Sequence, residues 1–515
     1  MNFKVLMSAI FASAIAVAGC SDDSGGTAGS GGTAGSGGTA GSGGTGGAPE
    51  AVDCNDLPSV DAYAVGEVFD NVPVTASDDC TAPTFMTGAD AAARLNTRLE
   101  NADPGDVICL AEGTYEMDGT INVSLVGDLV IKGIGDSPDD TVLNFAGPGS
   151  GIGIFVQKDD VTVENLWVKN SGANGIEQDG VSGSVFRKVH VSWDDFCVGD
   201  DAPANCGEAC ETDEDCGELV LACEGDVCVG DQGKNGAYGI YPTNCEDTLV
   251  EFSQAQDAAD AGIYIGKCGW LDDETTGGIV RYNIAANSVA GLEVENCLDV
   301  VAHDNLVMGN TGGLMPLQQP ISADRPANTG VLMENNMVWC NNGKNFAETG
   351  VVQIIPVGTG VLSLGGQGVE IRNNDIQGNR SIVMALVSSS FTCDAAGADC
   401  PPYSYPYNAY AEDIYAHDNY FAENGTNFDQ DSDFYILFDL LDLGTPENPT
   451  DDILWDGQIR EGVDDPEICL GADFDGTYRD LSQNMCQGVT PDVAYAGCLA
   501  TNNTTDTTGR LCDRE

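Results

Sequence analysis

The chain has 515 residues, of which 82 are Asp or Glu and 19 are Lys or Arg, so its formal net charge is −63. Because like charges repel, this composition excludes a general affinity for nucleic acid or anionic membrane surfaces, and it disfavours a polyanionic substrate unless Ca2+ bridges the two. Twenty cysteines indicate an oxidising compartment.

The first segment has the composition of a secretory signal. Residues 1–19 carry one charge, Lys4, followed by an apolar run from Val5 to Ala18, and such segments are removed from the mature protein. The run ends in Val17-Ala18-Gly19-Cys20, which resembles the bacterial lipobox, a motif whose cysteine is lipidated and becomes the first mature residue. This resemblance implies lipidation of Cys20 and membrane contact through the lipid anchor only. The alternative is an ordinary secretory signal with an incidental cysteine.

A flexible tether is predicted next, within residues 20–50. From Ser24 to Gly47 the chain repeats Gly, Ser, Thr and Ala, whose side chains bury little apolar surface. A signal, a lipidated cysteine and a tether, in this order, predict a protein of the cell envelope, at the outer membrane or the cell surface. Residues 51–88 form an N-terminal segment, and no later stretch is long and apolar enough for a transmembrane helix.

The body of the chain contains an internal repeat that predicts stacked strands. Short segments alternate aliphatic with polar or aromatic residues, which is strand periodicity. Segments this short cannot form a sheet alone, so each must pair in parallel with the same segment one repeat later, about 4.8 Å away. The clearest copies are Gly239-Ile-Tyr-Pro-Thr-Asn-Cys245, Gly262-Ile-Tyr-Ile-Gly-Lys-Cys268 and Gly291-Leu-Glu-Val-Glu-Asn-Cys297, with weaker copies at Gly175 and Gly313.

Pairs of asparagines recur in phase with this repeat. Asparagine tolerates left-handed backbone at turns, and its amide can hydrogen-bond to the asparagine of the next coil. Repetition of one pair at matching places indicates the turns of a solenoid. The pairs are Asn165 with Asn170, Asn305 with Asn310, Asn336 with Asn341, Asn374 with Asn379, and Asn419 with Asn424.

On these residues the chain resembles the right-handed parallel β-helix repeat proteins, the group that includes pectate lyases and many carbohydrate-binding proteins and sugar hydrolases. An amphipathic helix over residues 91–101 precedes Pro104-Gly105-Asp106 and Glu112-Gly-Thr-Tyr115. In that group a short helix caps the open end of the core, and such strands begin the first coil. The resemblance implies an all-β fold, a single-stranded right-handed parallel β-helix over residues 89–430. It implies no particular reaction, because the fold hosts many chemistries.

Two segments fall outside the repeat. Residues 197–233 contain many cysteines and no histidine, which favours a disulfide-held loop inserted into the solenoid over a zinc site. Residues 431–515 form an acidic, cysteine-containing tail that is expected to cap the last coil, because a bare terminal coil is an exposed strand edge.

Cysteine spacing suggests local disulfides without fixing them. Cys245, Cys268 and Cys297 share one repeat position, so they form either a stacked internal ladder or a pair across adjacent coils. The other candidate pairs are Cys393 with Cys400, Cys469 with Cys486, and Cys498 with Cys512.

A candidate binding site follows from counting along the repeat. Residues two positions beyond each repeat glycine would form one outward ladder, and residues four positions beyond would form another. Tyrosines flanked by carboxylates suit a sugar chain, because the rings pack on the apolar face of a sugar and the carboxylates accept its hydroxyls. The first ladder holds the candidate substrate-binding residues Glu177, Tyr241, Tyr264 and Glu293, followed by Met315, and the second holds Asp179, Thr243, Gly266, Glu295 and Leu317.

The same face offers groups for catalysis. Glu293 and Glu295 lie on one predicted strand, about 7 Å apart by strand rise, and this separation is compatible with acid–base work. In a lyase or epimerase, Lys267 or Tyr264 could act as the base beside the sugar.

Metal binding and plain solvation are the alternatives for this face. Asp257 and Asp260 could join Glu293 as oxygen ligands of Ca2+. The simpler interpretation is a solvated ladder of polar residues, because outward strand positions are normally polar.

The sequence therefore predicts a surface-anchored β-helix lipoprotein that binds or processes a polysaccharide, either neutral or bridged by Ca2+. If it is an enzyme, the resemblance favours a polysaccharide lyase, hydrolase or epimerase. The alternative is a non-catalytic protein of adhesion or envelope architecture, favoured by the tether, the acidity and the lack of a recognisable catalytic set. We expect a monomer without a nucleic-acid partner.

Overall fold

A computed structural model describes residues 51–55, 57, 72, 74–145, 147, 150–194, 221–224, 227–270, 276–319, 329–389, 408–486 and 492–512. The expected signal, Cys20 and the tether lie outside the described residues, as do most of the cysteine-rich segment 197–233 and both Cys393 and Cys400. Within the described ranges, no helix is long and apolar enough to cross a bilayer.

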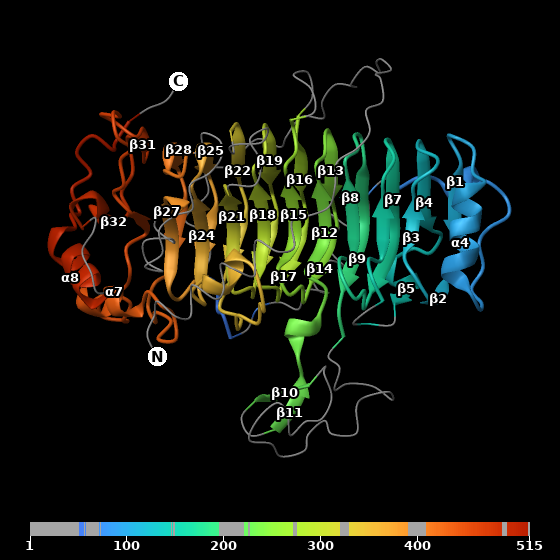
Figure 1. The fold of residues 1–515 in the computed structure, drawn as a ribbon, viewed down its shortest axis with the longest axis horizontal. Coiled ribbons are helices and arrows are strands. Elements are labelled where there is room, and N and C mark those ends of the chain that lie inside the picture. The colour runs from blue at the N-terminus through green and yellow to red at the C-terminus, as the bar shows by residue number, and fades with distance from the viewer. Residues whose placement is uncertain are drawn as a thin grey trace.

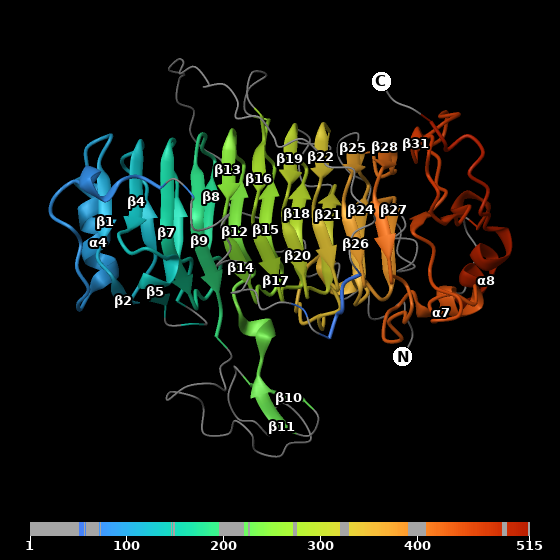
Figure 2. The same cartoon turned by 180° about the vertical axis from the view of Figure 1, so that it is seen from behind.

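The chain winds as a parallel β-helix, in which three ladders of strands run along one long axis (Figures 1 and 2). Each strand pairs in parallel with the strand at the same place one coil later. The ladder called sheet B consists, in order, of β3 (Ile121–Val123), β6 (Ile154–Val156), β8 (Ile176–Asp179), β12 (Tyr238–Thr243), β15 (Ala261–Gly266), β18 (Ala290–Glu295), β21 (Gly312–Leu317), β24 (Thr359–Leu364), β27 (Ile382–Val387), β30 (Ile453–Trp455) and β32 (Tyr478–Asp480).

The other two ladders belong to one bent sheet, sheet A, because the long strands β7 (Val161–Lys169) and β9 (Val185–Ser192) take part in both. Besides these, the first ladder contains β1 (Val107–Leu110), β4 (Leu129–Gly133), β13 (Thr248–Glu251), β16 (Gly278–Arg281), β19 (Val300–His303), β22 (Val331–Glu334), β25 (Gln367–Arg372), β28 (Glu412–His417) and β31 (Ile468–Cys469). The second contains β2 (Gly113–Met117), β5 (Thr141–Phe145), β14 (Gln254–Gln256), β17 (Ile284–Ala286), β20 (Leu306–Met308), β23 (Met337–Trp339), β26 (Asp375–Gln377) and β29 (Tyr420–Ala422).

Inward side chains fill the solenoid with one continuous apolar core. In sheet B the inward position of successive coils is Ile176, Ile240, Ile263, Leu292 and Leu314, all fully buried. Equivalent residues therefore lie over one another, as the glycine repeat predicts.

Two internal ladders of asparagine line the corners of the coils. Each side-chain amide donates to the Oδ1 atom of the asparagine one coil later, at 2.9–3.2 Å, and to a backbone carbonyl of the coil before. The ladders are Asn283, Asn305, Asn336, Asn374 and Asn419, and Asn310, Asn341, Asn379 and Asn424. The predicted bonding is confirmed for the four later pairs. Asn165, in the earliest pair, donates instead to the backbone carbonyls of Gly133 and Gly135.

Helices close both ends of the described solenoid (Figure 1). The helix α4 (Ala91–Glu100) packs Leu95 and Leu99 against the first coils, as its amphipathic pattern predicts. At the other end lie α7 (Tyr435–Leu440) and α8 (Asp492–Asn502). Parallel pairing continues past residue 430, because β30, β31 and β32 extend the ladders.

A hairpin and several short 3-10 turns lie outside the three ladders. An antiparallel pair, β10 (Leu221–Glu224) and β11 (Val227–Gly230), projects away from the solenoid, and Cys223 and Cys228 within it are disulfide-bonded (Figure 1). The 3-10 turns are η1 (Ser77–Asp79), η2 (Pro138–Asp140), η3 (Gln232–Lys234), η4 (Val351–Ile354) and η5 (Gln483–Cys486).

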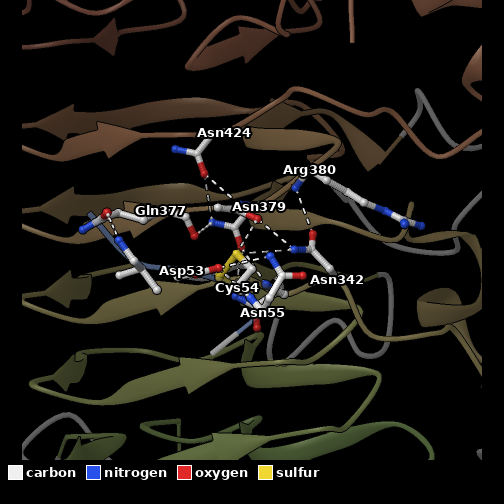
Figure 3. Close-up of a disulfide and its surroundings, with 12 residues drawn as sticks. Asp53, Cys54, Asn55, Asn342, Gln377, Asn379, Arg380 and Asn424 are labelled. Atoms are coloured by element: carbon white, nitrogen blue, oxygen red, sulfur yellow. Dashed lines mark hydrogen bonds between the residues drawn. A yellow bond between two sulfur atoms is a disulfide. The ribbon is translucent and has the colours of Figure 1, made fainter. Parts of the chain in front are cut away.

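A disulfide fastens the N-terminal segment to the side of the solenoid. Cys54 is bonded to Cys340, 286 residues later, directly after β23 (Figure 3). The backbone amide of Val52 donates to Gln377 of the next coil at 3.1 Å. The described chain thus begins beside the middle coils rather than at an end.

Other disulfides follow the coils. Cys80 is bonded to Cys109 on β1. Cys245 is bonded to Cys268 across adjacent coils, which is one of the two alternatives for that repeat position. Cys297, at the same position of the third copy, is buried with its sulfur 3.3 Å from the backbone oxygen of Ile265.

Two local disulfides expected near the C-terminus are wrong. Cys469 pairs with Cys512 rather than Cys486, and Cys486 pairs with Cys498. Cys469 ends β31, and the returning C-terminal chain brings Cys512 within 5.7 Å of it between Cα atoms. Nearness in space, set by the coils and α8, decides the pairing.

Candidate functional site

The predicted ladder exists on the outer face of sheet B. The register pairs Glu177 with Tyr241, and Tyr264 with Glu293. The rings of Tyr241 and Tyr264 are 4.7 Å apart between centroids, so these residues are side by side from coil to coil. Phe155 extends the ladder on one side, against Glu177, and Met315 extends it on the other, against Glu293.

The second ladder runs parallel to the first along the same strands. Its register brings together Asp179, Thr243, Gly266, Glu295 and Leu317. The two ladders meet where the Tyr264 hydroxyl donates to Glu295 at 3.2 Å. Gly266 leaves the room for this contact, because a Cβ there would lie 2.0 Å from the Tyr264 hydroxyl.

A third tyrosine completes a cluster that counting along the repeat missed. Tyr238 stands one residue before the repeat glycine Gly239, outside the two counted positions. Its ring stacks on Tyr241 at 4.3 Å and lies 5.1 Å from Tyr264 between centroids. The three rings therefore contact one another.

Three carboxyl groups that influence one another's charge lie beside these tyrosines, and they are called the carboxyl cluster below: Asp260, Glu293 and Glu295. The carboxyl of Glu293 interacts with those of Asp260 and Glu295, and the carboxyl of Asp260 interacts with Tyr238. Both Glu293 Oε2 and Asp260 Oδ1 are buried without a hydrogen-bond partner. Glu293 is 2% exposed and Glu295 6%, whereas Asp260 is partly exposed.

Burial governs the protonation of this cluster. Loss of water around the charged form raises the pKa of Asp260 to about 7, and burial together with the charges of Asp260 and Glu295 raises the pKa of Glu293 well above its usual range. Burial also raises the pKa of Glu295, whereas the nearby ammonium of Lys267 acts to lower it. Burial raises the pKa of Tyr264 well above its usual range.

The expected solvation of the ladder is therefore wrong for Tyr264, Glu293 and Glu295. A segment between β23 and β24, residues 343–356, packs over this part of sheet B and is called the cover segment below. Its apolar side chains join the cluster that contains the three tyrosines; they are Phe346, Ala347, Val351, Val352 and Ile355.

The cover segment is held at its start and in its middle. The amide of Gly343 donates to the Asn310 carbonyl at 2.9 Å. Glu348 forms an ion pair with Lys234, at the base of the cysteine-rich insertion. Gly350 lies beside Asp260, since a Cβ on it would be 3.4 Å from Asp260 Oδ2. Two long turns from distant parts of the sequence thus meet above the tyrosines.

The other end of the ladder is more accessible. Phe155, Glu177 and Tyr241 are partly exposed. Asn174 donates to Glu177 at 2.7 Å, and burial raises the pKa of that carboxyl. Lys267, also partly exposed, follows β15 in left-handed backbone, and its amide donates to the Glu295 carbonyl at 2.8 Å. The ladder therefore passes from an accessible end into a closed one.

The proposed calcium ligands Asp257 and Asp260 interact with different neighbours. Asp260 interacts with Tyr238 and Glu295, whereas the charge that acts on Asp257 is that of Asp194. Burial and that charge raise the pKa of Asp257 to about 7. In the part of the chain that the structure describes, no group of three or more His, Cys, Asp or Glu side chains could hold a metal ion.

Beyond Met315 the same face becomes apolar. A cavity of about 50 Å³ lies between sheet B, the cover segment and α7, and its lining includes Leu317, Ile355, Leu362 and Leu437. Its apolar lining offers no donor or charge to a sugar, so the polar end of sheet B is the candidate site.

Comparison with known proteins agrees with the fold. The chain matches the family described as right handed beta helix region over residues 141–320. Together with the parallel ladders, this match shows a right-handed parallel β-helix. No curated protein matches the chain.

Several solved structures are similar to it. The A-module of the mannuronan C-5 epimerase AlgE4 of Azotobacter vinelandii is 14% identical over 73% of this chain and 79% of that chain, with a TM-score of 0.41. An alginate lyase from Paenibacillus sp. is 14% identical over 75% of this chain and 93% of that chain, with a TM-score of 0.30. A tailspike protein of E. coli bacteriophage HK620, in complex with a pentasaccharide, is 10% identical over 73% and 58%, with a TM-score of 0.40.

Proposed function

We propose that this protein is a glycan-binding β-helix of the cell envelope, with its binding surface on the outer face of sheet B around Phe155, Glu177 and Tyr241. The observation that carries the proposal is the register of these side chains, ring beside carboxylate beside ring in successive coils. Aromatic rings pack on the apolar face of a sugar, and carboxylates accept its hydroxyls.

The proposed glycan carries no negative charge. Five carboxyl groups belong to this face, and Lys267 is the cation whose charge acts on the carboxyl cluster. An anionic sugar would have to approach these groups against the formal net charge of −63. The carboxyl groups of the face are Glu177, Asp179, Asp260, Glu293 and Glu295.

Binding, rather than bond cleavage, suits the geometry of the two glutamates. The paired carboxyls of glycosidases stand about 5 to 9 Å apart, so that water or a sugar fits between them. The carboxyls of Glu293 and Glu295 are instead closed off from solvent, because these residues are 2% and 6% exposed. A sugar does not reach them while the cover segment is in place.

The test is binding of the purified protein to an array of neutral, anionic and amino glycans. Replacing Tyr241 by alanine should weaken binding about tenfold, because a ring on a sugar contributes on the order of 1 kcal/mol beyond its buried area. The matched control is Tyr420→Ala, since Tyr420 is a partly exposed ladder residue on β29 of sheet A. Equal behaviour of the two variants, or a protein that retains no glycan, would refute the proposal and favour a structural role in the envelope.

The envelope location depends on Cys20, which we propose to be lipidated. Substitution of Cys20 by serine should move the protein from the membrane fraction to the soluble fraction of the producing cell, because acyl chains supply the membrane affinity. Mass spectrometry of the mature N-terminus gives an independent check. An unmodified Cys20 in a membrane-free wild-type protein would contradict the anchor and leave the glycan site untouched.

A further inference from the structure

We infer that the glycan recognised by this protein carries a free amine, and that the carboxyl cluster of Asp260, Glu293 and Glu295 receives this amine. This inference rests on the proposed glycan-binding function and names the chemical class of its ligand. It starts from two buried carboxyl oxygens that have no donor, Glu293 Oε2 and Asp260 Oδ1.

Unpartnered oxygens of this kind are costly. A buried acceptor without a hydrogen bond destabilises the folded protein, and it does so more strongly when it carries charge. Buried polar groups in folded proteins are otherwise satisfied. Glu293 is only 2% exposed, and its carboxyl group interacts with the carboxyls of Asp260 and Glu295. A ligand donor at this place would remove the cost.

The charges around these oxygens favour a cationic donor over a hydroxyl. Burial keeps protons on this cluster, because the pKa of each of its three carboxyls is raised, and Lys267 acts on Glu295 alone among them. An ammonium group supplies three donors and one positive charge, so it both satisfies the oxygens and stabilises the ionised form of the carboxyls. A hydroxyl would supply one donor and no charge.

The tyrosines add to this preference. The face of a tyrosine ring carries negative charge density and attracts a cation, most strongly where water is excluded. Tyr238, Tyr241 and Tyr264 lie within 5.1 Å of one another between ring centroids and share one cluster. A metal ion is the competing cation, but the described residues offer no group with the arrangement to hold one.

Access is through Asp260. This residue is partly exposed, although its Oδ1 atom is buried, and Gly350 of the cover segment lies beside its carboxyl. A sugar resting on Tyr241 would bring an amine toward Asp260 first, and displacement of the cover segment would admit it to Glu293. The ion pair between Lys234 and Glu348 is the exposed contact that this movement breaks.

The experiment compares three trisaccharides by isothermal titration calorimetry on the full mature chain. They are a glucosamine trimer with free amines, its N-acetylated counterpart and a galacturonate trimer. The free-amine trimer should bind about tenfold or more tighter than the N-acetylated one, because its ammonium forms charge-assisted hydrogen bonds that an acetamide cannot form.

Variants separate recognition from the general attraction of a cation to an acidic protein. Glu293→Gln keeps the shape and removes one charge, and it should erase the preference for the free amine. The matched control is Glu116→Gln, because Glu116 is exposed on β2 and accepts from Asn144 at 3.0 Å. Asp260→Asn serves as a second variant, and circular dichroism shows that each variant is folded.

Each outcome has one meaning. Equal or tighter binding of the N-acetylated trimer, with dependence on Tyr241, overturns the amine and keeps the glycan-binding function. Equal weakening by Glu116→Gln and Glu293→Gln shows attraction to net charge only and also overturns it. Preference for the galacturonate trimer on adding Ca2+ overturns it in favour of a metal. If no trisaccharide binds, the amine inference is overturned, and the glycan array alone decides the glycan-binding function.

Discussion

Substitution of Asn336 by alanine tests the role of the asparagine ladders in holding the coils together. The Asn336 amide donates to Asn374 Oδ1 and to the Ala302 carbonyl, both at 3.0 Å. Its Oδ1 atom accepts from the backbone amide of Asn305 at 3.0 Å and from the Asn305 side chain at 2.9 Å. The residue is fully buried, so water cannot replace these bonds.

The expected cost follows from these four bonds. Each contributes about 0.5 to 1.5 kcal/mol, and a donor or acceptor left unpaired in the interior costs about 1 to 3 kcal/mol. We therefore expect Asn336→Ala to lower the free energy of unfolding by about 4 kcal/mol. Urea unfolding followed by circular dichroism measures the change, since the midpoint shifts in proportion to the stability lost.

The matched control is Asn144→Ala. Asn144 is a partly exposed asparagine on β5 that exchanges side-chain bonds with Glu116 and Asn170, where water can take their place. Its loss should cost at most about 1 kcal/mol. If the two variants lose similar stability, the interior asparagines do not hold successive coils together and the reasoning is refuted.

Three further results are expected. Because the pKa of Asp260 is raised, the folded state binds one more proton than the unfolded state between about pH 4 and 7, so stability falls as pH rises through that window. Asp260→Asn should therefore flatten the fall in Tm measured from pH 4 to 8. An unchanged profile of Tm against pH contradicts this. Glu348→Ala removes the ion pair with Lys234 and should speed amide hydrogen exchange in residues 343–356, measured by mass spectrometry. Tm should stay nearly constant, because exposed ion pairs contribute little to stability. Unchanged exchange would show that the ion pair does not hold the cover segment. Cys54→Ser opens a covalent loop of 286 residues and should lower the free energy of unfolding in urea by about 3 to 5 kcal/mol. The loss should exceed that of Cys486→Ser, whose disulfide joins residues only 12 apart. The reverse order would count against loop closure as the cause.

The register of sheet B could be predicted because the repeat contains it. The intervals between Gly239, Gly262, Gly291 and Gly313 are 23, 29 and 22 residues, which are unequal. Counting from each glycine nevertheless brings the right residues together, because added residues enter the turns while strands keep their places. The pairing of Tyr264 with Glu293 follows directly.

The burial of the site could not be predicted in the same way. The cover segment comes from a turn that begins fifty residues beyond Glu293, and nothing in the repeat marks where that turn folds back. Periodicity shows which way a side chain points from its strand, but not what lies above it. For this reason Glu293 and Glu295, expected in solvent, are buried, and burial raises the pKa of both carboxyls.

The disulfide partners near the C-terminus could not be predicted from the sequence for a related reason. The pairing of Cys469 with Cys512 depends on the path of the chain through α8 and back to β31, a region where the repeat fades. Cys245 and Cys268, by contrast, lie at one position of consecutive coils, and the repeat itself placed them close enough to pair. Tyr238 was missed because it stands before its glycine rather than after it.

The bond between Cys54 and Cys340 sets the route by which mechanical load enters the molecule. A pull on the chain that precedes residue 51 reaches Cys54 and passes through two sulfur atoms into the coil of Cys340. The strands from β1 to β23 lie inside the covalent loop that this bond closes, so the pull bypasses them. A protein held by its N-terminus in moving fluid would thus keep the coils that carry Tyr241 and Glu293 free of tension.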